Sequence, residues 1–187
     1  MKTIIVYYSF TNNNEILAKH LQEKLQCDLL KIETVRPRNS FSILLDLMFN
    51  RRSKIKPHAK SLKEYDHCIF LSPIWAGRIS SPLLSFLLQE KDNINRYSFI
   101  TVCGGGNADQ KGKLTDDMAK VLQRMPVFVQ ELWINDLLTE EKKNTIKYTS
   151  GYRLQEKDLA LFSTKLEEFL QQISPASATK PKETQHA

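Results

Sequence analysis

Apolar residues along the chain follow two alternating patterns. Short continuous runs rich in β-branched and aromatic residues predict strands that are buried on both faces. These runs cover residues 2–8, 29–32, 67–71, 97–103 and 127–134. Between and after the runs, apolar residues recur every three or four positions, which predicts helices with one apolar face. The helical stretches cover residues 16–25, 41–49, 82–88, 114–122 and 159–173.

Five alternations of strand and helix predict an α/β protein, a three-layer sandwich in which helices cover both faces of a parallel sheet. A chain of 187 residues is long enough for one such domain, and the doubly wound strand order 2-1-3-4-5 needs only five strands. We place the domain at residues 1–173 and expect a disordered tail at 174–187, which is rich in Pro, Ala, Ser, Thr and Lys. The polar stretch 135–153 is assigned no element.

Sheets of this kind bind ligands outside the carboxyl ends of their strands, at the switch point between strands one and three. The loops that meet there follow Tyr8, Leu71 and Val102. Functional residues are therefore expected in these three loops.

The first loop, Ser9-Phe10-Thr11-Asn12-Asn13-Asn14, lies between a buried strand and a helix. Its hydroxyl and amide groups, the N–H groups of the first helical turn and the helix dipole all favour a bound anion such as a phosphate. The loop has no lysine or arginine, so neutral donors would hold the phosphate. Alternatively, these side chains cap the helix and shape the turn.

The second loop contains a tryptophan in an unusual setting. Its sequence is Ser72-Pro73-Ile74-Trp75-Ala76-Gly77-Arg78. The indole of Trp75 offers a flat stacking surface, and Gly77 lets the backbone flip or approach a ligand closely. Alternatively, Trp75 folds back and covers the next helix.

The third loop follows Cys103 and begins with three glycines, Gly104-Gly105-Gly106, before Asn107-Ala108-Asp109. Four of the six glycines of the chain thus fall in the second and third loops. A triple glycine presents bare backbone donors to a planar or anionic group, although a flexible surface turn is the alternative. The three loops together favour a ligand with a phosphate at one end and a flat aromatic system at the other, and FMN is the common cofactor of that shape.

With these motifs in place, the sequence resembles the flavodoxin family over residues 1–173. The first loop resembles the family's S-x-T-G-N-T phosphate loop, and Pro73 to Gly77 resembles its P-x-W-x-G turn. The third loop resembles the family's glycine-containing third loop. The resemblance implies a flavodoxin-like fold and an FMN site. It assigns the phosphate to Ser9, Thr11, Asn12, Asn13 and Asn14, one side of the isoalloxazine to Pro73, Ile74, Trp75, Ala76 and Gly77, and its other side to Cys103, Gly104, Gly105 and Gly106.

The chain departs from the family pattern at two positions of the first loop. Asn12 stands where the family has glycine, and asparagine tolerates left-handed backbone angles better than most residues. Asn14 stands where the family has threonine and can still cap the helix and donate a hydrogen bond. No metal site is expected, because the three cysteines, Cys27, Cys68 and Cys103, are scattered without metal-ligand spacing.

The net charge of +6 is local. The segment from Arg36 to Lys63 holds eight Lys and Arg residues against only Asp46 and carries +7, so the rest of the chain is close to neutral. This argues against a nucleic-acid partner. The segment could bind an anionic partner or, with the 41–49 helix, a membrane surface; alternatively, the helix covers the sheet and its basic flank is solvated.

The chain shows no apolar run of roughly 20 residues, the length that spans a bilayer, and opens without signal-peptide architecture, so we expect a cytoplasmic protein with reduced cysteines.

Two functions fit these observations. The first is an FMN-dependent oxidoreductase that takes hydride from NAD(P)H and reduces a quinone-like or other small acceptor. The second is a flavodoxin-type one-electron carrier, which would need a partner redox protein in place of its own NAD(P)H activity. The sequence disfavours a response-regulator receiver, because a receiver needs acidic residues where the chain has Ser9 and Ser72. The loops contain no histidine, so no acid or base is assigned, and the oligomeric state stays open.

Overall fold

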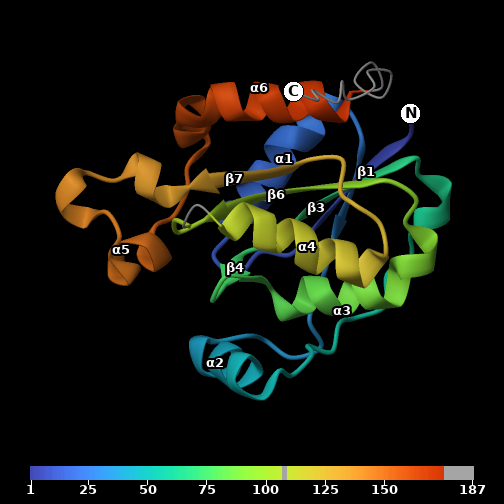
Figure 1. The fold of residues 1–187 in the computed structure, drawn as a ribbon, viewed down its shortest axis with the longest axis horizontal. Coiled ribbons are helices and arrows are strands. Elements are labelled where there is room, and N and C mark those ends of the chain that lie inside the picture. The colour runs from blue at the N-terminus through green and yellow to red at the C-terminus, as the bar shows by residue number, and fades with distance from the viewer. Residues whose placement is uncertain (107–108, 175–187) are drawn as a thin grey trace, which may run out of the picture.

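The computed structural model describes residues 1–106 and 109–174 of the chain. Its central sheet has five parallel strands: β1 (Thr3–Tyr7), β2 (Asp28–Lys31), β3 (His67–Leu71), β6 (Tyr97–Cys103) and β7 (Val129–Trp133). Their order is β2-β1-β3-β6-β7, which is the predicted 2-1-3-4-5 order with the strands counted in sequence. The structure therefore confirms the flavodoxin-like sheet (Figure 1).

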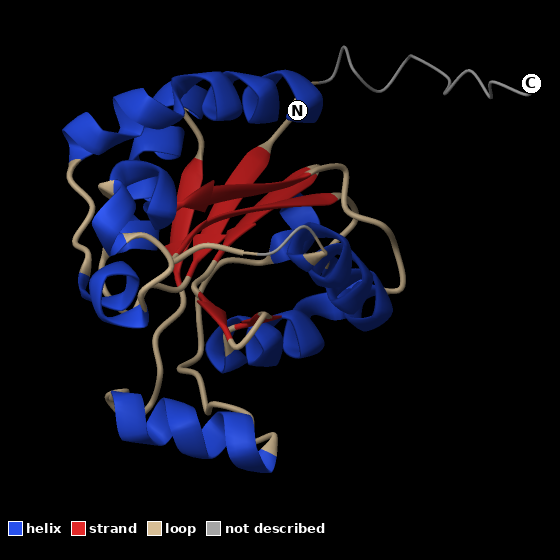
Figure 2. Cartoon of the chain, turned by 60° about the vertical axis from the view of Figure 1, so that its left-hand side comes forward, coloured by secondary structure: helices blue, strands red, loops and turns tan. Residues whose placement is uncertain are grey.

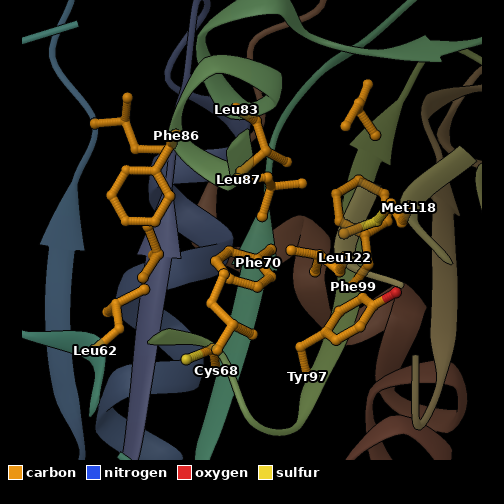
Figure 3. Packing of buried hydrophobic residues seen from close by; sticks show 14 of the residues in the cluster. Leu62, Cys68, Phe70, Leu83, Phe86, Leu87, Tyr97, Phe99, Met118 and Leu122 are labelled. Carbon is orange, nitrogen blue, oxygen red and sulfur yellow. The ribbon is translucent and has the colours of Figure 1, made fainter. Parts of the chain in front are cut away.

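Helices cover both faces of the sheet, as predicted. Alternate strand residues point to opposite faces, so Ile4 and Val6 belong to one core cluster and Ile5 to the other. The first cluster packs under α3 (Ser81–Glu90) and α4 (Gln110–Leu122), and Figure 3 shows Phe70 and Phe99 at its centre. The second packs under α1 (Asn13–Leu25) and α6 (Ser163–Ile173).

Several local elements differ from the sequence prediction. Two short strands, β4 (Ile74–Trp75) and β5 (Arg78–Ile79), form an antiparallel hairpin that alternation did not reveal. The predicted helix over 159–173 begins as a 3-10 helix, Glu156–Phe162, and becomes α-helical only at Ser163. The unassigned stretch contains two 3-10 turns, Ile134–Leu137 and Glu140–Lys142, and helix α5 (Ile146–Gly151). Two further 3-10 turns are Leu62–Glu64 and Lys91–Asn93.

Helix α2 (Ser40–Phe49) lies outside the three-layer sandwich (Figure 2). None of its residues is buried, and within the described ranges none belongs to either core cluster. The interpretation in which this helix covers the sheet is therefore wrong. Its interior-facing side instead lines two cavities near the carboxyl ends of the strands.

Three further predictions concern the ends and the composition of the chain. The expected disordered tail falls almost wholly on residues 175–187, outside the described residues; only Ser174, which ends α6, is described. Among the described residues, no helix combines the length and the apolar character that crossing a bilayer requires. All three cysteines are free thiols.

Candidate functional site

A cavity of about 430 Å³ lies at the carboxyl ends of β1, β3 and β6. Residues from all three predicted loops line it together: Thr11, Asn13, Asn14, Pro73, Ile74, Trp75, Cys103 and Gly104. Ser9 and Asn12 belong to the first loop without lining this cavity. Ala76, Gly77, Gly105 and Gly106 line a separate hollow of about 450 Å³ with Lys113.

The first loop presents unpaired donors. Asn12 precedes α1 with φ 66°, a left-handed conformation that asparagine adopts more readily than most residues. The first helical hydrogen bond runs from the Ile16 N–H to the Asn12 carbonyl, so the N–H groups of residues 13–15 have no partner within the helix. No side chain caps the helix, so the capping part of the alternative is wrong, whereas the left-handed Asn12 does shape the turn. The buried Ser9 hydroxyl has no hydrogen-bond partner in the described part of the chain.

The side chains of Asn13 and Asn14 have a different role from the one the resemblance implies. Asn14 donates to the Val102 carbonyl at 3.1 Å and accepts from the Val102 N–H at 2.9 Å. Asn13 donates to the Tyr152 carbonyl at 3.1 Å and accepts from the Leu154 N–H at 3.0 Å. Both side chains are buried. They therefore hold α1 against β6 and the segment after α5, and only their backbone N–H groups stay free for an anion.

The second loop is the β4–β5 hairpin, which fixes the position of Trp75. Ala76 (φ 49°) and Gly77 (φ 72°) form its turn with left-handed backbones. The half-buried indole meets the Tyr8 ring edge to face at 6.0 Å between centroids and the Phe10 ring at 6.2 Å. Trp75 thus packs on the core through the Tyr8 and Phe10 rings and also lines the cavity, where its indole is placed to meet a ligand.

Trp75 also borders a neighbouring cavity of about 380 Å³ between α2, the hairpin, α3 and α4. Its apolar wall includes Leu47, Ile79 and Leu84. Two carboxylates, Asp46 and Asp117, and four cationic side chains line it as well; the cations are Arg51, Arg78, Lys113 and Lys120. None of these four forms an ion pair with another described residue. This cavity could not be predicted from the sequence, because its cations come from three separate parts of the chain: the segment after α2, strand β5 and helix α4.

The glycines of the third loop allow close packing against the segment that follows β7. A Cβ at Gly105 would lie 2.3 Å from Nδ2 of Asn135, and one at Gly104 would lie 3.1 Å from Cβ of Thr149. The Asn135 N–H donates to the Gly104 carbonyl at 3.0 Å, so this contact also fixes the loop. The glycines therefore meet a packing requirement as well as offering backbone donors. Asn107 and Ala108 lie outside the described residues.

The unassigned stretch contributes residues that the sequence analysis missed. Thr149, Ser150 and Arg153 line the 430 Å³ cavity. The Arg153 guanidinium donates to the carbonyls of Ser150 and Tyr152, both at 3.1 Å. The positively charged Arg153 therefore lines this cavity, although the sequence predicted only neutral donors for the phosphate. Arg153 is the only arginine in the 135–153 stretch, but nothing in its spacing indicates that it returns to the first loop.

Two titratable residues near or behind the site are unsuited to acid–base work. Burial, reinforced by Glu131, raises the pKa of the Cys103 thiol, which stays protonated. His67 lies at the amino end of β3, opposite the cavity, and is fully buried. The described residues contain no group of three His, Cys, Asp or Glu side chains that could hold a metal ion.

The strand order, the three loops and the cavity at the switch point define a flavodoxin-like α/β protein. No protein-family model and no curated protein sequence matches the chain. Among solved structures, it is similar to a flavoprotein from Lactobacillus acidophilus NCFM in complex with FMN, at 17% identity and TM-score 0.61, over 70% of this chain and 92% of that chain. A protein assigned as a flavoprotein from Bacteroides eggerthii is similar at 20% identity and TM-score 0.58, over 75% and 91%. These likenesses establish the fold.

Proposed function

We propose that the chain binds FMN in the 430 Å³ cavity and transfers electrons through it. The observation that carries this proposal is that all three loops line this cavity together, with the free N–H groups of α1 at its first-loop side. The buried Ser9 hydroxyl in the same loop, although it does not line the cavity, also has no hydrogen-bond partner among the described residues. Buried polar groups are rarely left unpaired, so a partner is expected there. A flavoprotein of the same fold, from L. acidophilus, was solved with FMN, which supports this choice of ligand.

The residues that would hold each part of FMN differ in chemistry. Ser9, Thr11, the α1 N–H groups and Arg153 suit the phosphate, since hydroxyl, amide and guanidinium groups all donate to it. The segments Pro73–Gly77 and Cys103–Gly106 suit the two sides of the isoalloxazine. When bound, FMN supplies the one- and two-electron chemistry. The protein orients it and excludes water.

The finer proposal is an NAD(P)H-dependent oxidoreductase that reduces a quinone-like or other small acceptor. The 380 Å³ cavity supports it, because its four cations outnumber its two carboxylates and, with its apolar wall, suit a reactant that carries phosphates and an aromatic ring. Trp75 is shared by this cavity and the candidate FMN cavity, which would bring the two ligands close. The alternative is a one-electron carrier. The left-handed backbone of Ala76 is compatible with both functions, since such strain concentrates at functional sites of either kind.

The test is a titration of the apo-protein with FMN and, as the matched ligand without phosphate, riboflavin. Quenching of flavin fluorescence, a higher melting temperature with FMN and weaker riboflavin binding are expected. If FMN neither quenches nor raises the melting temperature, the flavin proposal is wrong. Steady-state NAD(P)H oxidation with a quinone acceptor then separates the two functions, because a carrier alone oxidises no NAD(P)H.

A further inference from the structure

Helix α2 turns a stripe of large apolar side chains toward solvent. Phe41, Leu44 and Met48 share one helical face, since they are spaced by three and four residues, and they are 68%, 51% and 67% exposed. Phe49, at the edge of this stripe, is 59% exposed. Large apolar side chains gathered in one exposed patch mark an interaction site, whereas scattered ones need no explanation.

The opposite side of α2 is fixed to the rest of the protein, so the fold itself exposes the stripe. The Asp46 carboxylate accepts hydrogen bonds from Arg38 and, at 2.8 Å, from the Ser81 hydroxyl at the start of α3. Asn39 and Ser42 form a capping box that fixes the first turn of α2. Figure 2 shows this helix standing apart from the sandwich, where a flat surface could reach it.

Unpaired cations accompany the apolar stripe. Three of the eight cations in segment 36–63 form ion pairs, Arg38 with Asp46, Lys56 with Glu33, and Lys60 with Asp28. The other five are exposed and form no ion pair with a described residue: Arg36, Arg51, Arg52, Lys54 and Lys63. The Arg51 guanidinium lies over the Phe49 ring, 5.0 Å from its centroid, so positive charge and apolar surface adjoin.

We propose that α2 and four of these cations, Arg36, Arg51, Arg52 and Lys54, dock the protein on the surface of an anionic lipid bilayer. The fifth, Lys63, lies just before β3, at the opposite edge of the sheet. A protruding helix with an apolar outer face can enter the headgroup region, while cations beside it attract anionic lipids. A second copy fits less well, because two such faces would bring like charges together. Ser40 and Ile43 of α2 line the candidate cofactor cavity, so docking would hold that cavity next to the lipid. The docking itself does not depend on FMN.

Flotation with vesicles tests the proposal. The full chain should float with vesicles of equal parts phosphatidylcholine and phosphatidylglycerol but not with pure phosphatidylcholine, and added salt should release it. The double variant Phe41→Ser/Met48→Ser should bind about tenfold more weakly or worse, because two apolar side chains no longer leave water. Replacing Arg51 and Arg52 by Gln should weaken binding by roughly fivefold for each cation.

Matched controls separate this face from general charge and hydrophobicity. Leu161→Ser removes an apolar side chain that is 73% exposed on another part of the surface, and Lys24→Gln/Lys157→Gln removes two cations elsewhere; both should bind as the wild type does. Failure to bind anionic vesicles, equal binding to neutral ones, or unchanged binding in the α2 variants would overturn the proposal. A dimer in solution that Phe41→Ser/Met48→Ser dissociates would overturn it in favour of a second copy.

Discussion

The indole of Trp75 is the side chain in the cavity best suited to stack on a flat ligand. Trp75→Ala should weaken FMN binding roughly threefold to tenfold or more, since stacking is worth about 0.5–1.5 kcal/mol beyond the area it buries. The spectrum of oxidised bound flavin should also change, because its ring would meet water. Trp75→Phe, which keeps a flat ring, should lose less affinity.

Because Trp75 also packs on the core, the alanine variant should lower the melting temperature of the apo-protein as well. Affinities are therefore best compared by fluorescence titration well below both melting temperatures. A variant that loses stability but keeps its full FMN affinity would show that Trp75 serves only the core, and the second loop would lose its assigned role.

Arg153 leads to a second prediction at the residue scale. If its guanidinium faces the phosphate, Arg153→Gln should weaken FMN binding by roughly fivefold, about 1 kcal/mol for a charge-assisted contact at an exposed site. Affinity of the wild type should fall as salt rises, and that of the variant should fall less. Riboflavin binding should not respond to the substitution. Lys24→Gln, a similar loss of charge near the other end of α1, should change neither titration.

At the scale of elements, Asn14 connects the start of α1 to the end of β6. Asn14→Ala would leave the buried N–H and carbonyl of Val102 without their side-chain partner. Each unsatisfied buried group costs about 1–3 kcal/mol, so the free energy of unfolding of the apo-protein should fall by about 2 kcal/mol or more in urea denaturation. A residue that served only the ligand would leave apo stability unchanged. Asn95→Ala, at an exposed asparagine, should have little effect.

Elements with a clear pattern of apolar residues could be predicted from the sequence. Elements whose position depends on tertiary contacts could not. Each of the five strands of the sheet contains a short run of consecutive apolar residues, so their positions and alternation with helices predicted the strand order. The strands β4 and β5 have two residues each, too few for any period. The α2 pattern of apolar residues is that of a covering helix, but Asp46 binds to α3 and holds α2 outside the sandwich.

The candidate site shows the same division. Loops that directly follow buried strands could be located, because the carboxyl ends of parallel strands lie at one edge of the sheet. Arg153 reaches the cavity through a bend in a polar segment, and hydrogen bonds from Asn13 to residues 152 and 154 fix that bend. Such contacts join residues about 140 positions apart, a relation that no local spacing encodes.

At the scale of the whole molecule, His67 links folding to pH. Its ring is fully buried at the amino end of β3, with Nε2 3.0 Å from the Ser98 hydroxyl oxygen. Burial, and to a lesser degree the charge of Arg96, lowers the pKa of His67 from 6.5 to about 4. The unfolded chain therefore takes up this proton at a higher pH than the folded chain does. As pH falls from about 6.5 to about 4, proton binding favours unfolding and stability is lost.

The free energy of unfolding should fall by about 3 kcal/mol because of His67 once the pH is below its pKa in both the unfolded and the folded chain. His67→Gln removes this titration, so its free energy of unfolding, measured by urea denaturation, should fall less between pH 6.5 and 4. The variant can be less stable at neutral pH; the difference in slope is the diagnostic quantity. Asn95→Ala, at an exposed position without a titratable side chain, should keep the wild-type slope. Parallel curves for the wild type and His67→Gln would mean that His67 is as free to bind a proton in the folded protein as in the unfolded chain, contrary to its burial between the two helix layers.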